Sequence, residues 1–228
     1  MPQNPKPQRS LNRPEALAPA PAGRLYAIVD ADVCARVNRA PLDVARAFLS
    51  AGAKLIQLRC KSWGSAAFLD LALAAVEDAG RAGATVIVND RADVAALAHA
   101  PGLHVGQEDL SPADARAVIG AGPILGLSTH TVEQWTSALA QPISYIAIGP
   151  VFGTGTKDTG YDAVGVGSVA AASTAAARAG LPTVGIGGIT GDNAVSVIDA
   201  GAAAVAIISD LLHGDPETRC RALLRMLE

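Results

Sequence analysis

Short apolar runs alternate with longer Ala-rich segments along almost the whole chain after Arg24. The runs are apolar at nearly every position, which is typical of strands buried on both faces of a parallel sheet. They predict eight strands: Leu25–Val29, Lys54–Leu58, Thr85–Val88, Leu103–Val105, Ile124–Leu127, Tyr145–Ile148, Thr183–Gly185 and Ala204–Ile207.

The segments between and after these runs predict eight helices. Pro41–Ala51 and Ser65–Ala82 have the clearest ends, because each is followed by a glycine and the first begins with proline. Ser111 and Thr190 are predicted N-caps. The remaining helices are predicted at Arg91–Ala98, Ser111–Ile119, Thr131–Ala140, Gly167–Ala179, Asp192–Ala200 and Pro216–Leu227.

Strict alternation of strands and helices fits either an open, doubly wound sheet or a closed barrel. Eight strand–helix units in roughly 200 residues, with no second compositional zone, favour the barrel. The predicted fold class is therefore α/β, a single (β/α)8 TIM barrel over residues 24–228.

The segment before the barrel differs in composition. Residues 1–22 hold six of the 14 prolines and no aromatic residue, so we predict a disordered, Pro-rich tail over residues 1–23. The tail lacks the apolar stretch of a signal peptide, and no run approaches the ~20 apolar residues of a membrane span. We therefore expect a cytoplasmic protein without a membrane partner.

The net charge and the spacing of Cys and His argue against nucleic-acid binding, membrane anchoring and a Cys/His metal site. The 18 basic and 21 acidic residues give a net charge of −3, which argues against a nucleic-acid partner or a polybasic membrane anchor. The three cysteines have no CxxC spacing and the four histidines form no HxxxH pair. Any bound metal is therefore expected to be a hard cation with oxygen ligands.

Polar residues gather directly after the predicted strands. In an α/β barrel these positions share one end, where the chemistry of such folds is found. The opposite strand ends are mostly Gly, Ala and Pro. The polar segments are Gln57–Lys61, Asn89–Asp90, Gly106–Asp109, Ser128–His130, Gly149–Asp158, Gly185–Gly188 and Ile208–Ser209.

Two acidic residues, Asp90 and Asp109, follow neighbouring strands. Taken singly, Asp90 is equally well explained as a helix cap and Asp109 as a solvated loop residue. Together at one barrel end they predict an Mg²⁺ site, since Mg²⁺ takes one or two carboxylates and substrate phosphate oxygens.

Three cations, Arg59, Lys61 and Lys157, reach the same barrel end. A single basic side chain is usually only solvated, but three beside a metal pair favour a polyanion such as a diphosphate. His130 is interpreted either as an acid–base group or as a hydrogen-bonded loop residue.

A second phosphate site is predicted in the last two loops. Gly185–Gly188 precedes a helix, and glycines there let a phosphate approach backbone N–H groups at the helix N-terminus. A tight turn explains the glycines equally well, but Ser209 in the next loop completes the usual barrel phosphate site.

These motifs, in this order, resemble thiamine-phosphate synthase over the chain from Arg24 onward. The resemblance implies a (β/α)8 enzyme, a transferase that joins hydroxymethylpyrimidine diphosphate and thiazole phosphate and releases diphosphate. It implies Mg²⁺ at Asp90 and Asp109. The thiazole phosphate would contact Thr154, Gly155, Thr156, Gly188, Ile208 and Ser209.

The resemblance also implies which residues hold the pyrimidine diphosphate: Gln57, Arg59, Lys61, Asn89, Ser128 and Lys157. Of these, Arg59, Lys61, Ser128 and Lys157 are the expected catalytic residues. No nucleophile is required, because the protein stabilises the departing charge and aligns the attacking group.

Two other functions stay open. A thiazole tautomerase-like relative would use a histidine at the position of His130 and would not need the Mg²⁺ ligands. A non-catalytic sensor of thiamine phosphate would keep the pocket without turnover. The charged residues argue against both, and the expected partners are small-molecule substrates, with homo-oligomerisation left open.

Overall fold

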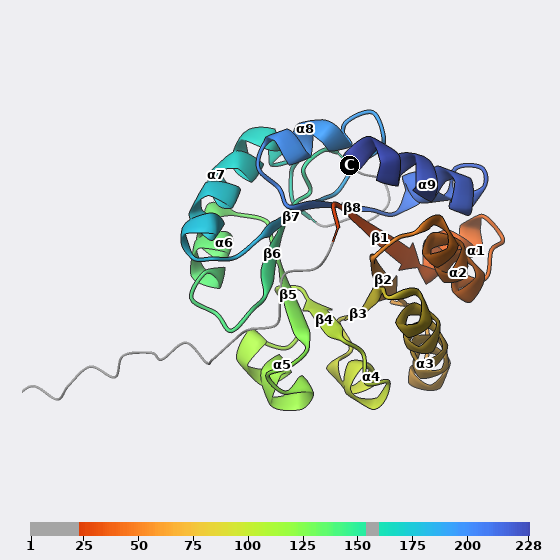
Figure 1. Ribbon diagram of the computed structural model, residues 1–228. Coiled ribbons are helices and arrows are strands. Elements are labelled where there is room, and N and C mark those ends of the chain that lie inside the picture. The colour runs from red at the N-terminus through yellow and green to blue at the C-terminus, as the bar shows by residue number, and fades with distance from the viewer. Residues whose placement is uncertain (1–22, 154–159) are drawn as a thin grey trace, which may run out of the picture.

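A computed structural model describes residues 23–153 and 160–228, and its eight parallel strands close into a barrel surrounded by helices (Figure 1). Each strand pairs with the next one in the chain, and β1 also pairs with β8. The predicted barrel is confirmed and the open sheet is excluded. The strands are β1 Leu25–Asp30, β2 Leu55–Arg59, β3 Thr85–Asn89, β4 Gly102–Val105, β5 Ile124–Thr129, β6 Tyr145–Ile148, β7 Thr183–Ile186 and β8 Ala204–Ile207.

Helices follow the strands and form the outer ring. In the described residues they are α1 Ala31–Arg36, α2 Pro41–Ala51, α3 Ser65–Ala82, α4 Ala92–Leu97, α5 Pro112–Ile119, α6 Val132–Ala138, α7 Gly165–Arg178, α8 Ala194–Asp199 and α9 Pro216–Leu227, with a 3-10 helix η1 at Ser209–Leu212. The predicted elements differ from these by at most two residues at either end. α1 and η1 were not predicted, and α1 directly follows β1 with no turn residue between them.

Local chemistry explains where the helices begin. Ser111 is confirmed as an N-cap, because its Oγ accepts a hydrogen bond from the Asp114 N–H at 3.2 Å. Thr190 is wrong as the N-cap of α8, which begins at Ala194. The Thr190 N–H instead donates to Asn193 Oδ1 at 2.8 Å, and this turn delays the start of the helix.

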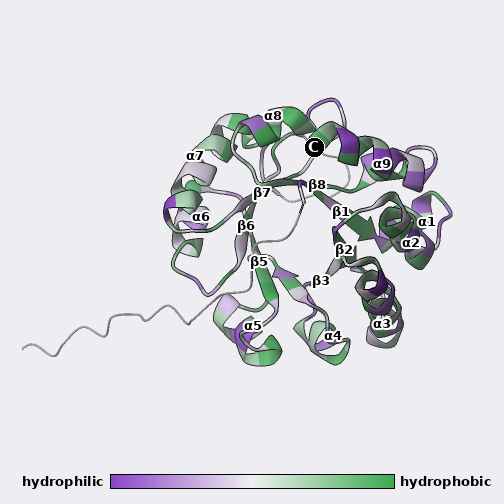
Figure 2. Cartoon of the chain, viewed as in Figure 1, coloured by the Kyte–Doolittle hydropathy of each residue, from purple (hydrophilic) through white to green (hydrophobic). Residues whose placement is uncertain are grey.

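Two apolar clusters hold the fold. The larger lies between the strands and the helices and includes Phe48 and Phe68, and the smaller fills the barrel interior around Tyr26 and Tyr145. Figure 2 shows mainly hydrophobic strands, with hydrophilic residues on outer helices such as α3 and α9. Burial of both strand faces accounts for the nearly continuous apolar runs in the sequence.

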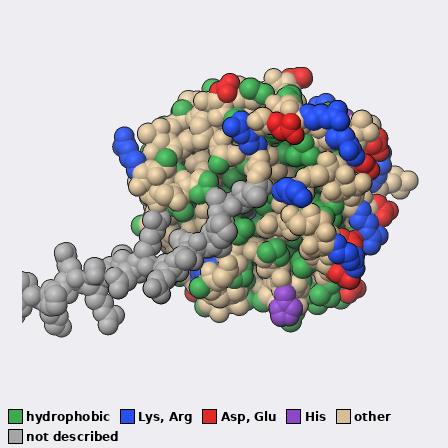
Figure 3. All heavy atoms as spheres, in the orientation of Figure 1, with side chains coloured by type: hydrophobic (Ala, Val, Ile, Leu, Met, Phe, Trp, Pro, Cys, Tyr) green, Lys and Arg blue, Asp and Glu red, His purple; other side chains and the backbone are tan. Residues whose placement is uncertain are grey.

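Charged side chains are unevenly spread on the face seen in Figure 3, where most lie on the side of α2, α3 and α9. Several form ion pairs there, including Arg46 with Asp78 and Arg221 with Glu217. These pairs are exposed, so each contributes little to stability. No helix in residues 23–153 or 160–228 has the length and apolarity that a membrane crossing requires.

Candidate active site at the carboxyl ends of the strands

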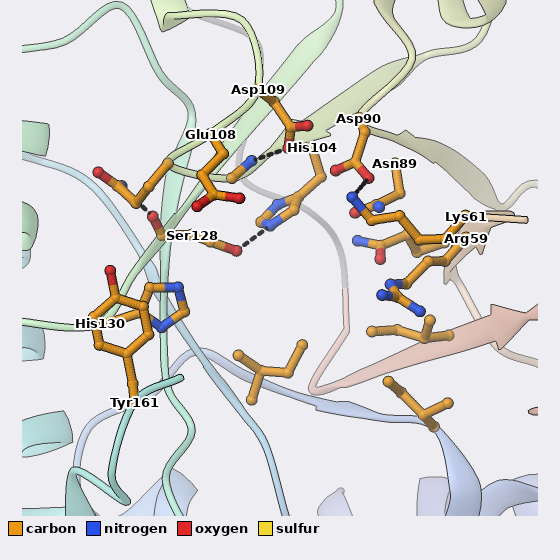
Figure 4. Close-up of a pocket in the computed structure, with 16 residues that line it drawn as sticks. Arg59, Lys61, Asn89, Asp90, His104, Glu108, Asp109, Ser128, His130 and Tyr161 are labelled. Carbon is orange, nitrogen blue, oxygen red and sulfur yellow. Dashed lines mark hydrogen bonds and ion pairs between the residues drawn. The ribbon is translucent and has the colours of Figure 1, made fainter. Parts of the chain in front are cut away.

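A pocket opens at the carboxyl ends of the strands, as expected for this fold (Figure 4). Eight of the predicted site residues line it: Gln57, Arg59, Lys61, Asn89, Asp90, Asp109, Ser128 and Ile208. Ile28, His104, Gly106, Gln107, Glu108, His130, Tyr161 and Ile186 complete the lining. Residues from β2 to β5, which are far apart in sequence, thus face one cavity.

Arg59 is fixed by an ion pair that has no signal in the sequence. Its guanidinium contacts the carboxylate of Asp30, which is 1% exposed, and the two residues are partners in the β1–β2 register. Asp30 also accepts a hydrogen bond from the Val33 N–H at 2.9 Å and so caps α1. One carboxylate therefore orients the cation and starts the following helix.

Cys60 lies between two pocket cations but belongs to the apolar layer outside the barrel. Burial, together with Asp30 and Asp32, raises the pKa of the Cys60 thiol to about 12. The thiol therefore stays protonated and apolar, and it serves packing rather than the chemistry of the pocket.

The two predicted metal ligands lie next to each other. Asp90 forms an ion pair with Lys61, and burial and the neighbouring Asp109 carboxyl raise the pKa of Asp90 against the lowering effect of Lys61. The backbone of Asp90 is left-handed (φ 64°), which turns the chain sharply after β3. Two carboxyls this close repel each other when both are ionised.

Asp109 is held in place by its own loop, since its Oδ2 accepts a hydrogen bond from the Gly106 N–H at 2.8 Å. The described residues contain no group of three or more His, Cys, Asp or Glu that could hold a metal by itself. Two adjacent carboxylates fit a cation such as Mg²⁺ that also draws oxygen ligands from a phosphorylated substrate.

The floor of the pocket contains a histidine that the sequence analysis placed inside a strand. His104 is 5% exposed, and its Nε2 lies 2.8 Å from Ser128 Oγ (Figure 4). Gln57, on the other side of the pocket, donates from Nε2 to the buried Tyr26 hydroxyl at 2.8 Å. The alternation of side chains along a strand could have predicted that His104 and Gln57 point into the barrel. Their hydrogen-bond partners are determined only when the barrel closes.

His130 lies at the pocket rim in a network of contacts. Its Nδ1–H donates to the Gly149 carbonyl at 2.5 Å, and its ring stacks on that of Tyr161 with centroids 4.2 Å apart. Gln134 accepts from the His130 N–H at 2.7 Å and donates to the Tyr161 hydroxyl at 3.2 Å. These contacts favour the interpretation of His130 as a hydrogen-bonded loop residue.

The residues predicted to bind the second phosphate are only partly within the pocket. Ile208 lines it, whereas Gly188 and the first η1 residue, Ser209, lie outside its lining. Gly188 packs so closely on Phe152 that a Cβ there would lie 2.8 Å from Phe152 Cβ. The predicted residues Thr154, Gly155, Thr156 and Lys157 lie outside the described residues.

A buried carboxylate joins the last two loops. Asp210 Oδ2 accepts from the Gly191 N–H at 3.0 Å, and both Asp210 oxygens accept from Arg219 of α9 at 2.7–2.9 Å. The loop after β7 is thus tied to the loop after β8 through the residue that follows Ser209.

Comparisons with known proteins agree on one family. The model of the family described as thiamine monophosphate synthase matches residues 25–211. The chain is 43% identical over 208 residues to a thiamine-phosphate synthase of Roseiflexus castenholzii, with 90% of this chain and 89% of the relative covered. A thiamine-phosphate synthase of Chlorobium luteolum is 39% identical over 191 residues, covering 83% of this chain and 89% of the relative.

Among solved structures, the thiamine phosphate pyrophosphorylase from Pyrococcus furiosus superposes with a TM-score of 0.80 at 26% identity. The match covers 90% of this chain and 95% of that one. The family model's match, residues 25–211, spans all eight strands of the barrel.

Proposed function

Since the chain belongs to the thiamine monophosphate synthase family, we propose that it joins a hydroxymethylpyrimidine diphosphate to a thiazole phosphate, giving thiamine phosphate and diphosphate. In this reaction the C–O bond of the pyrimidine methylene breaks and its electron pair leaves with the diphosphate. The thiazole nitrogen then supplies the electron pair of the new C–N bond. No protein nucleophile takes part.

The observation that carries this proposal is the pairing of cations with carboxylates on one side of the pocket. Arg59 is held by Asp30, and Lys61 by Asp90 beside Asp109. A diphosphate entering there meets fixed positive charge, and it finds two carboxylates with which to share a divalent cation. Fixed charges stabilise a departing anion without reorganising during the reaction.

Mg²⁺ is the proposed cation, held by Asp90 and Asp109. It would neutralise charge on the departing diphosphate. Support comes from the raised pKa of Asp90, because a cation between the two carboxyls relieves the repulsion that burial and Asp109 impose.

The pyrimidine ring is assigned to the pocket floor, between Gln57, Asn89 and Ser128. Gln57 and Asn89 are 3% and 8% exposed, so a ring held between them is shielded from water. Arg59 and Lys61 then bind the diphosphate, and Lys157, which lies outside the described residues, is the third proposed cation. This geometry leaves the methylene carbon facing the far side of the pocket, where the attacking ring must lie.

The thiazole phosphate is assigned to the loops after β6, β7 and β8, at Thr154, Gly155, Thr156, Gly188, Ile208 and Ser209. The Asp210 link between the last two loops supports this assignment, because it keeps the glycine turn and Ser209 in one unit. Both substrates carry phosphate groups that hinder membrane passage, and we accordingly propose a cytoplasmic location.

The test mixes the purified protein with both phosphorylated substrates and Mg²⁺ and follows diphosphate release and thiamine phosphate formation. Equal amounts of the two products are expected. Binding of thiamine phosphate without turnover would instead support the sensor. Isomerisation of a thiazole carboxylate phosphate, abolished in His130→Asn, would support the tautomerase-like function.

A further inference from the structure

Five buried or half-buried side chains from five strands form a continuous chain of hydrogen bonds beneath the pocket. Gln57 Nε2 lies 2.8 Å from the Tyr26 hydroxyl, which lies 3.0 Å from the Tyr145 hydroxyl. Tyr145 is 2.8 Å from His104 Nδ1, and His104 Nε2 is 2.8 Å from Ser128 Oγ. Both ends of the chain, Gln57 and Ser128, line the pocket.

The order of donors and acceptors along this series of hydrogen bonds follows from its first donor, the Gln57 amide. Gln57 donates to Tyr26, so the Tyr26 oxygen is an acceptor and its own hydrogen is available for Tyr145. The Tyr145 hydrogen is then available for His104 Nδ1, which lies 2.8 Å away. If Tyr145 instead donated to Tyr26, the Tyr26 oxygen would accept from both Gln57 and Tyr145. The Tyr26 hydrogen would then be used in neither contact, and an unused donor in a buried group costs free energy.

The protonation of the tyrosines is consistent with this direction. Burial raises the pKa of both Tyr26 and Tyr145, so each keeps its hydrogen at neutral pH. The contact between Tyr145 and His104 also needs space. A Cβ at Gly126 would overlap the Tyr145 ring and lie 2.5 Å from His104 Nδ1, so only glycine at this position of β5 leaves room.

We propose that Gln57, Tyr26, Tyr145 and His104 form a directional relay that holds His104 as the Nε2–H tautomer and thereby makes the Ser128 hydroxyl a hydrogen-bond donor to the ligand. His104 Nε2–H donates to Ser128 Oγ, which leaves the Ser128 hydrogen available to the pocket. His104 and the two tyrosines act as positioning residues.

The relay defines which ring fits the pocket floor. Ser128 offers a donor, so the ligand atom that faces it must be an acceptor, such as the unprotonated nitrogen of an aromatic heterocycle. This assignment of the ligand rests on the proposed function, whereas the tautomer of His104 in the ligand-free protein does not.

The first experiment measures the tautomer directly. Wild-type protein labelled with ¹⁵N-histidine contains only four histidines, and the His104 signals are identified by their loss in His104→Gln. We expect a protonated Nε2 and an unprotonated Nδ1 in the ligand-free protein. A protonated Nδ1, alone or together with Nε2, would overturn the proposal.

Two variants test the relay itself. Tyr145→Phe keeps the ring but removes the donor to Nδ1, so the tautomer is expected to become mixed. Tyr26→Phe removes the hydroxyl that fixes the direction of the Tyr145 hydrogen, so a smaller shift toward the mixed tautomer is expected, and no shift there would remove Gln57 and Tyr26 from the relay. An unchanged tautomer in Tyr145→Phe overturns the relay, and thermal unfolding checks that both variants are folded.

The second experiment measures the effect on the ligand. In Tyr145→Phe we expect affinity for the pyrimidine diphosphate to fall about tenfold, the size of one hydrogen bond, with KM for the thiazole phosphate unchanged. Equal effects on both substrates would overturn the assignment of Ser128 as a donor. If wild-type protein shows no turnover, the proposed function fails while the tautomer measurement still decides the relay.

Discussion

The carboxylate of Asp30, buried at the end of β1, is ion-paired with the guanidinium of Arg59 at the end of the neighbouring strand. The Arg59 side chain is 15% exposed, so a cation that faces the pocket is anchored from within the barrel. Its position therefore depends on a residue that does not line the pocket.

The Asp30→Asn variant should distinguish the two roles of this residue, which are the ion pair with Arg59 and the N-cap of α1. Asn retains an oxygen for the Val33 N–H but leaves Arg59 without its counter-charge. We expect unfolding free energy to fall by about 3 kcal/mol and affinity for the diphosphate substrate to fall on the order of tenfold. Urea unfolding and calorimetry measure the two effects.

The Asp30→Ala variant also loses the N-cap of α1, so its unfolding free energy should fall by about 1 kcal/mol more. Unchanged binding of the diphosphate substrate in both variants would contradict the anchoring of Arg59 by Asp30.

Asp90→Asn should stabilise the metal-free protein while removing activity. The pKa of Asp90 is raised in the fold, so its ionisation lowers stability above that pKa, and the cost disappears as the pH falls toward the ordinary value of 3.8. The variant should therefore melt at a higher temperature than wild type at pH 7, and the difference should shrink toward pH 4. Asn also tolerates the left-handed backbone at this position.

A matched control for the stability of Asp90→Asn is Asp93→Asn. Arg91 lowers the pKa of Asp93, so ionised Asp93 adds stability above its unfolded-state pKa, and this is lost as the pH falls. Asp93 is exposed, so the variant should lose a little stability at pH 7. Melting curves in EDTA that show the same sign for both variants would contradict the repulsion at Asp90.

Asp109→Asn should weaken the response to Mg²⁺. One of the two proposed carboxylate ligands is then neutral, and Mg²⁺ requires anionic oxygens to displace its waters. We expect the Mg²⁺ concentration for half-maximal rate to rise at least tenfold, with the fold retained because Asn can still accept from the Gly106 N–H. Wild-type rates at limiting Mg²⁺ would show that Asp109 is not a ligand, and Asp93→Asn serves as the control acid.

Lys61→Ala and Ser209→Asp should affect different substrates. Removing Lys61 takes one cation from the diphosphate side, whereas a carboxylate at position 209 repels a phosphate in the loops after β7 and β8. Separate titrations should show weaker pyrimidine diphosphate binding in the first variant and weaker thiazole phosphate binding in the second. The reversed pattern would contradict the proposed division of the pocket.

The sequence predicts the fold well because the strands are buried on both faces and the longer helices have clear ends and an apolar period. Ser65–Ala82, for example, has the predicted boundaries. The start of α8 is wrong by two residues because a side-chain contact from Asn193 to the Thr190 N–H forms a turn there. A turn of this kind, which competes locally with the helix, leaves no periodic pattern in the sequence.

Most of the predicted site residues end or follow a strand, whereas the buried residues that support them, such as Asp30, His104 and Tyr145, were not predicted. Asp90, Asp109, Arg59 and Lys61 all come after a run of apolar residues, so their shared location follows from the barrel. The ion pair of Asp30 with Arg59 was not predicted, because the two residues are 29 positions apart and become neighbours only through the β1–β2 register. Tyr26 and Tyr145, 119 positions apart, read as apolar core in the sequence and meet only when the barrel closes.

The thread of polar side chains across the barrel interior limits how this scaffold can be altered. In barrels of this type the strands usually serve as a framework and the loops can be exchanged to create new chemistry. Here the framework and the site share one layer of side chains, from Tyr26 to Ser128, and the absent side chain of Gly126 belongs to it. Replacing these polar residues with larger aliphatic ones would increase apolar packing but would remove the groups that orient the ligand. A redesign for a new activity must therefore keep or redesign these interior residues together with the loops.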